Sequence, residues 1–236
     1  MLPYLLSIAT AALLIAVLYR YNGVRREPIE AMLLAVLVGG ALMSAAGRTL
    51  DAVYHLWPEV MTPTLEAGSG RKALIVAGVE EAAKLVGVVL LARLSRHFDG
   101  PLDGLVYGTA VGIGAGLFES FKYLDHLTPT LPILGGEAIR LVAHGLFGGI
   151  GGHAFGLAYT PCGGVRATRL RTGVLGFLLA LILHAGWDTI AFLHRLAPKE
   201  HDRVWLVALM AVTLAAWGTM ASLGRRADLD FTPASA

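Results

Sequence analysis

The stretch ALIVAGVEEAAKLVGVVLLA, residues 73–92, decides the fold class of this chain. It has the length of about 20 residues that a helix needs to cross the hydrocarbon core of a bilayer. Other long stretches are similarly apolar: residues 2–19, 31–47, 104–121, 141–159, 172–193 and 204–223. The sequence therefore predicts an all-α protein, a polytopic integral membrane helical bundle of about seven transmembrane helices.

The composition of the 236 residues excludes several classes of protein. Hydrophobic residues make up 56% of the chain and charged residues 15%, whereas a soluble domain has about 45–50% and about 25%. A formal net charge of +2 without a basic stripe argues against nucleic-acid binding. The only cysteine, Cys162, cannot form an intrachain disulfide. Any metal site must therefore be built from His, Asp and Glu.

The distribution of basic residues predicts an orientation in the membrane. No basic residue precedes the first span, whereas Arg20, Arg25 and Arg26 follow it. A cleaved signal peptide would show the reverse order, so this span is interpreted as an anchor with its N-terminus outside. Seven spans then place the C-terminus in the cytoplasm. We expect a multi-pass protein of the cell (inner) membrane, in contact with the lipid bilayer.

Three charged residues stand in the middle of the quoted stretch. Glu80, Glu81 and Lys84 each cost about 2.5–3.5 kcal/mol at the centre of a span, before pairing or water relieves that cost. Lys84 has a carboxylate both three and four residues before it, which suits an ion pair. A helix-packing ion pair is the alternative interpretation, but it does not need a second Glu. One lysine cannot neutralise both carboxylates, so one is left to contact another group or to hold a proton.

Later spans carry further acids and imidazoles. His184 and Asp188 are four residues apart and share a helix face. Glu119 could belong to the same polar site, or it could form an ion pair with Lys122 at the membrane interface. In the predicted topology the polar side chains of four helices fall at similar depth, which predicts a polar cavity in one half of the membrane. The candidate residues are Glu80, Glu81, Lys84, Glu119, Arg140, His144, His184 and Asp188.

Two other patterns predict packing. Gly104, Gly108, Gly112 and Gly116 follow a four-residue period, which places a flat strip on one face of a helix for close approach to a neighbour. His153 lies nine residues after the candidate His144 and therefore faces the opposite side of the helix, so we interpret it as a hydrogen-bonded packing histidine.

This set of residues favours chemistry with activated water. The sequence has several carboxylates and histidines but no G-x-S-x-G nucleophile motif. A buried Glu can act as a general base. Carboxylate and imidazole ligands would also suit Zn²⁺, although H-E-x-x-H is absent. A metal-assisted mechanism and a metal-free glutamate mechanism both stay open.

Four motifs in order resemble those of the PrsW-type intramembrane proteases, part of the CAAX-protease and bacteriocin-processing superfamily. The first motif, E-E-x-x-K, matches residues 80–84, and D-G-x-x-Y-G followed by a Glu matches residues 103–119. An Arg and a His match residues 140–144, and H-x-x-x-D matches residues 184–188. The resemblance implies a bacterial endopeptidase that cuts membrane-anchored substrates, such as single-span proteins like anti-sigma factors.

These observations lead to a set of expected roles. Glu80 or Glu81 activates water while Lys84 holds the other. Further members line the cavity as metal ligands, or as the acid and oxyanion stabiliser: Glu119, His144 and His184. Asp188 orients His184 or joins the ligands, and Arg140 supports the site. The expected segments are residues 1–72 with two helices and an interfacial loop, 73–193 as a four-helix catalytic core, and 194–236 with the last helix and a short tail.

Two other functions also fit the sequence. The same acids and histidines could form the relay of a proton- or ion-coupled transporter. A non-catalytic scaffold could bind membrane spans without cutting them.

Overall fold

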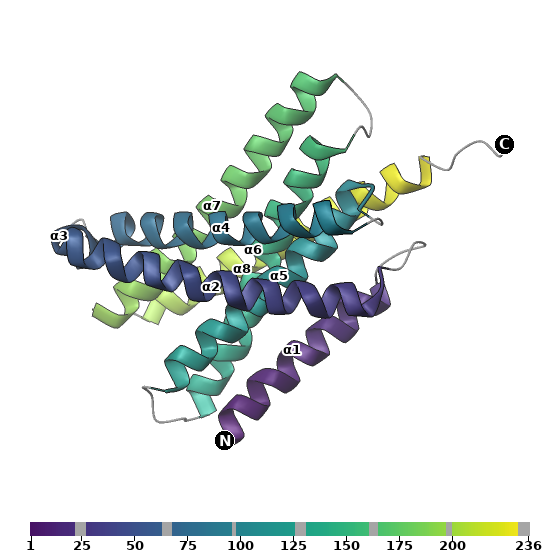
Figure 1. Cartoon of the computed structure of the whole chain (residues 1–236). Helices are drawn as coiled ribbons and strands as arrows, with labels where there is room; N and C mark the ends of the chain where they lie inside the picture. The colour runs from purple at the N-terminus through teal and green to yellow at the C-terminus, as the bar shows by residue number, and fades with distance from the viewer. Residues whose placement is uncertain are drawn as a thin grey trace.

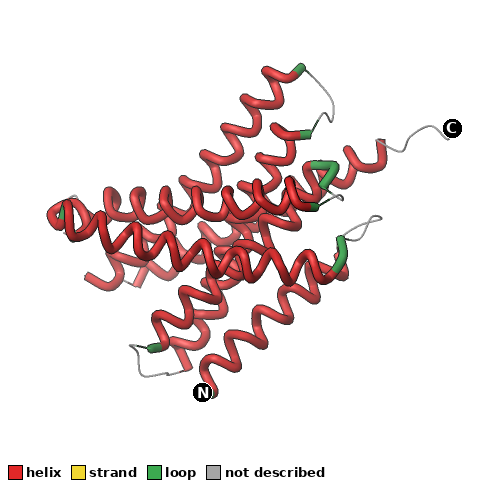
Figure 2. Tube along the Cα trace, in the orientation of Figure 1, coloured by secondary structure: helices red, strands yellow, loops and turns green. Residues whose placement is uncertain are grey.

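The structure, a computed structural model, describes residues 1–21, 27–62, 68–95, 98–125, 131–160, 165–196 and 200–230. These residues form helices and no strand (Figure 2). The lone cysteine, Cys162, lies outside the described residues. The helices are α1 (Leu2–Tyr21), α2 (Ile29–Leu56), α3 (Pro58–Met61), α4 (Gly68–Leu94), α5 (Pro101–Leu124), α6 (Leu131–Tyr159), α7 (Arg166–Leu196) and α8 (Glu200–Asp230).

The helices confirm a polytopic helical membrane bundle. Among the described residues, six helices are long and apolar enough to cross a membrane: α1, α2, α5, α6, α7 and α8. Helix α4 has 27 residues and is therefore about 40 Å long. It falls outside that set because Glu80, Glu81 and Lys84 lie within its apolar stretch. The chain is thus an integral multi-pass membrane protein, and the seventh span stays a prediction.

Helices α5 and α6 form the centre of the bundle and have the most extensive contact of any pair. Their backbones touch along the predicted glycine strip. A methyl group on Gly104, Gly108 or Gly112 would collide with a backbone carbonyl oxygen of α6. The carbonyl that faces Gly112 belongs to His144. The predicted packing role of the strip is confirmed, and the strip fixes the position of His144 against α5.

Helix α2 crosses α5 through a second glycine contact. A methyl group on Gly39 would collide with the carbonyl oxygen of Val111, and one on Gly114 with that of Val36. Two turns beyond this crossing the helices have separated. At Gly47 an added methyl group would meet only the tip of the Lys122 side chain and no backbone atom of α5. Helix α4 lies beside α2, and both also pack on α5 (Figure 1). The divergence of α2 and α5 leaves room for a cavity.

The N-terminal end of α5 is fastened by buried polar side chains. Asp103 accepts hydrogen bonds of 2.8 Å from both backbone N–H groups just ahead of the helix. The hydroxyl of Tyr107 donates to the buried carboxylate of Glu27, which precedes α2. Nδ1 of His153 lies 3.2 Å from the carbonyl oxygen of Pro101. The prediction that His153 is a packing histidine is confirmed, and the D-G-x-x-Y-G motif connects helices at this end.

Candidate functional site

Helix α4 supplies two adjacent buried carboxylates that differ in their contacts. Lys84 donates a hydrogen bond of 2.6 Å from Nζ to Oε1 of Glu81, and both side chains are buried. Oε2 of Glu80 is also buried and has no hydrogen-bond partner among the described residues. The prediction that one lysine serves only one carboxylate is confirmed. Glu80 is the acid left with an unsatisfied oxygen.

His184 of α7 connects to both carboxylates of α4. Its Nδ1 lies 2.7 Å from Oε1 of Glu81, within hydrogen-bond distance. Its Nε2 lies 3.6 Å from Oε2 of Glu80 and 3.7 Å from Oδ2 of Asp188, one turn further along α7. The imidazole ring also stacks on Phe147 of α6 at 4.9 Å between centroids. Glu81 therefore orients the ring, and Nε2 faces two carboxylates that are too far for hydrogen bonds.

His144 of α6 has a similar carboxylate partner on α5. Its Nε2 lies 2.8 Å from Oε2 of Glu119, and its Nδ1 is buried without a hydrogen-bond partner in the described chain. Nη1 of Arg140 lies 3.7 Å from the other oxygen of Glu119. The rings of His144 and His184 are 5.1 Å apart between centroids. The structure thus brings the candidate residues of four helices into one largely buried cluster.

Two side chains beside this cluster were not anticipated from the sequence. Glu137 forms an ion pair with Arg140, and the guanidinium group lies 4.2 Å from the centroid of the Tyr123 ring. The spacing of three residues between Glu137 and Arg140 on one helix was the available signal for the ion pair. No local pattern indicated Tyr123, which comes from α5. Lys122 forms no ion pair with Glu119 in the described structure, in contrast to the alternative considered above.

The cluster fits a metal ion. Glu80, His144 and His184 each offer one ligand atom, and these atoms lie within 4.8 Å of one another. Each histidine has one nitrogen beside a carboxylate, Glu119 or Glu81. The second nitrogen of His144 has no hydrogen-bond partner among the described residues, and that of His184 lies 3.6 Å from Glu80. Metal-binding histidines in proteins commonly have this arrangement. The group contains Glu80, whereas the sequence suggested Glu119, which contacts His144 instead.

A cavity of about 380 Å³ leads to the cluster. Glu80 and Glu119 lie on its wall, and Lys72 and Lys122 add two cations. Most other lining residues are apolar or aromatic and come from α2, α3, α4, α5 and α7: Met43, Leu50, Tyr54, Met61, Val76, Phe118, Tyr123 and Phe192. The cavity occupies the space between α2 and α5 beyond their glycine crossing. It gives a substrate segment and water a route to the two carboxylates.

Comparison with known families matches residues 27–217 to the PrsW family intramembrane metalloprotease. The match runs from the end of the α1–α2 connection to the middle of α8, and so includes every residue of the cluster. Neither curated proteins nor solved structures give a match.

Proposed function

Since the chain belongs to the PrsW family of intramembrane metalloproteases, we propose that it hydrolyses a peptide bond of a membrane-anchored protein at the cluster of Glu80, His144 and His184. The observation that carries this proposal is the convergence of these three side chains within 4.8 Å. Oε2 of Glu80 and Nδ1 of His144 are buried without a hydrogen-bond partner among the described residues. This supports a site built to bind another group, since unsatisfied buried polar atoms are costly.

The same three residues would hold the metal that the family name implies. A divalent ion such as Zn²⁺ bound there would supply a Lewis acid that activates water and polarises the scissile carbonyl. Glu81 and Glu119 serve as the partners that orient His184 and His144. Lys84 pairs with Glu81. This pairing supports a structural role for Glu81 over the role of proton acceptor, for which the sequence offered both Glu80 and Glu81.

Proton transfer falls to a carboxylate that borders the cavity. Glu119 lines the cavity and has a side chain that is 21% exposed. It can take a proton from the attacking water and pass it to the leaving amine, which is the usual work of a general base and acid. Arg140 holds the other oxygen of Glu119 and so limits its rotation. Asp188 lies 3.7 Å from Nε2 of His184, the nitrogen that would face the ion, and adds a negative charge on that side of the site.

The chemistry favours an unwound substrate. In an α-helix each backbone carbonyl oxygen accepts a hydrogen bond from the N–H group four residues on, so a scissile carbonyl group has to leave the helix before it can be polarised. The cavity reaches Glu80 and gives such a segment access to the cluster. This supports a single-span substrate that is cut near the end of its span, where local unwinding costs least.

The test uses the full chain in liposomes with a single-span protein as substrate. We expect Glu80→Gln and His184→Ala to abolish cleavage. Matched controls are Glu30→Gln and His55→Ala, which change exposed residues of α2 and should cut normally. Circular dichroism checks that all four variants keep their helices. Full cleavage by both site variants would contradict the proposal.

Metal use has a separate readout. Elemental analysis of the purified protein should find about one transition-metal ion per chain, and His144→Ala should lose it. Normal cleavage by protein shown to contain no metal would instead favour a mechanism in which the carboxylates at the cavity, Glu80 and Glu119, activate water without an ion.

A further inference from the structure

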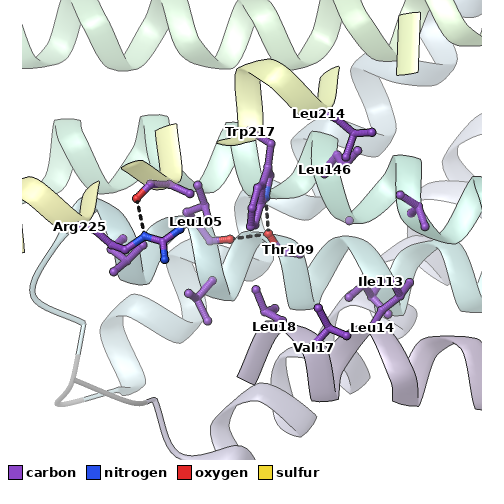
Figure 3. A pocket seen from close by; sticks show the side chains of 15 residues that line it. Leu14, Val17, Leu18, Leu105, Thr109, Ile113, Leu146, Leu214, Trp217 and Arg225 are labelled. Carbon is purple, nitrogen blue, oxygen red and sulfur yellow. Dashed lines mark hydrogen bonds between the residues drawn. The ribbon is translucent and has the colours of Figure 1, made fainter. Parts of the chain in front are cut away.

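A second cavity lies outside the catalytic cluster, in a groove between α1 and α8. Its volume is about 280 Å³, and its floor is formed by α5 and α6. Figure 3 shows the α1 side chains below the groove and those of α8 above it. The walls are almost entirely aliphatic and include Leu14, Val17, Leu18, Leu105, Leu146 and Leu214. None of the proposed catalytic residues lines this groove.

The few polar atoms in the floor already have partners. Nε1 of Trp217 donates a hydrogen bond of 3.0 Å to Oγ1 of Thr109. That hydroxyl in turn donates to the carbonyl oxygen of Leu105 at 2.7 Å. Both bonds are drawn in Figure 3. Because the floor has no polar group to satisfy, it favours an apolar occupant.

One end of the groove carries a positive charge. Arg225 of α8 lies at this end, and Leu14 and Ile113 lie at the other end (Figure 3). Its Nε donates to the carbonyl oxygen of Ala221 at 3.3 Å, and no carboxylate of the described chain pairs with it. The remaining donors of the guanidinium group suit a phosphate, which Arg can bind with two parallel hydrogen bonds.

We propose that the groove binds an anionic phospholipid, with an acyl chain along the aliphatic walls and the phosphate on Arg225. Aliphatic walls with a guanidinium group at one end match a molecule that has an apolar chain and a phosphate group. Val17 and Arg225 both lie outside residues 27–217, so two of the determinants belong to the part of the chain beyond the family match.

The test measures lipid binding to the delipidated full chain by native mass spectrometry. The probes are phosphatidylglycerol and phosphatidylcholine with identical palmitoyl and oleoyl chains. We expect phosphatidylglycerol to bind at least about tenfold more tightly, from the charged hydrogen bonds to its phosphate and the absence of a cationic headgroup. Arg225→Gln should remove that preference. The control Arg226→Gln changes an adjacent exposed arginine that does not line the groove and should leave the preference intact.

A groove-filling variant tests the acyl chain separately. Val17→Trp places a large ring in the groove at a side chain that is 46% exposed, so folding should tolerate it. It should weaken the binding of both lipids. Equal binding of the two lipids, equal effects of the two arginine variants, or unchanged binding to Val17→Trp would each overturn the proposal. The proposal would also be overturned if a photo-cross-linker at position 17 captured the substrate span instead of lipid. These readouts need no cleavage, so they stand apart from the proposed protease activity.

Discussion

Replacing Lys84 with Met should destabilise the protein far more than an ordinary surface substitution. Nζ of Lys84 and Oε1 of Glu81 are 2.6 Å apart, and at an effective dielectric constant of about 20 their attraction amounts to about 6 kcal/mol. The variant loses this attraction and leaves Glu81 charged and buried. Breaking a buried pair from one side typically costs about 3–5 kcal/mol in the free energy of unfolding.

The effect should be asymmetric between the two partners. Glu81→Gln keeps an oxygen that can accept from Lys84 and from Nδ1 of His184, and Glu80 lies one turn from Lys84 as a substitute counter-ion. We therefore expect Glu81→Gln to cost less than Lys84→Met. The double variant has no uncompensated charge from this pair and should recover most of the loss, which a double-mutant cycle would measure.

The measurement is reversible unfolding of the full chain in detergent micelles, followed by circular dichroism. Lys122→Met is the matched control, because it removes an exposed lysine that lines the cavity. Its stability should change by less than about 0.5 kcal/mol. The reasoning is refuted if Lys84→Met is as stable as this control, or if the double variant is no more stable than Lys84→Met.

Three further predictions concern the packing of α5, its hydrogen bond to Glu27, and the metal. Gly112→Val should abolish cleavage, because its side chain would collide with α6, whereas Gly78→Ala, with open space around it, should cut normally in the same assay. Tyr107→Phe should lower the free energy of unfolding by about 1–3 kcal/mol through the lost hydrogen bond to Glu27. Its cleavage rate per folded molecule should be unchanged, and a loss of rate would show a catalytic role. Removal of metal by a chelator should lower the melting temperature and Zn²⁺ should restore it, whereas Glu80→Gln should melt at the same temperature with and without the chelator.

The local features of the site could be predicted from the sequence. Helix periodicity alone places Lys84 beside both acids of its helix, and it separates His144 from His153. The apolar stretches likewise predict the helices that frame the site. These features depend only on neighbours within one helix, so one amino-acid sequence is enough to infer them.

Contacts between helices could not be predicted in the same way. Which carboxylate faces which imidazole nitrogen depends on how α4 meets α7 and how α5 meets α6. The sequence therefore suggested Glu119 as a ligand, whereas the structure groups Glu80 with the two histidines. Three features stay predictions: the orientation of the chain in the membrane, the position of the cavity in one half of the membrane, and the insertion of α4. They concern the protein's relation to a bilayer and not a contact within the chain.

The glycine contact between α5 and α6 has a consequence for how such an enzyme would open. Where two main chains touch, neither helix can slide or turn without a collision, so the separation of Glu119 and His144 is set by the backbone itself. A methyl group on Gly47 of α2 would meet only the tip of a flexible Lys122 side chain and no backbone of α5. A movement of α2 that admits a substrate would then pivot about Gly39 and leave Glu119 and His144 at their fixed separation.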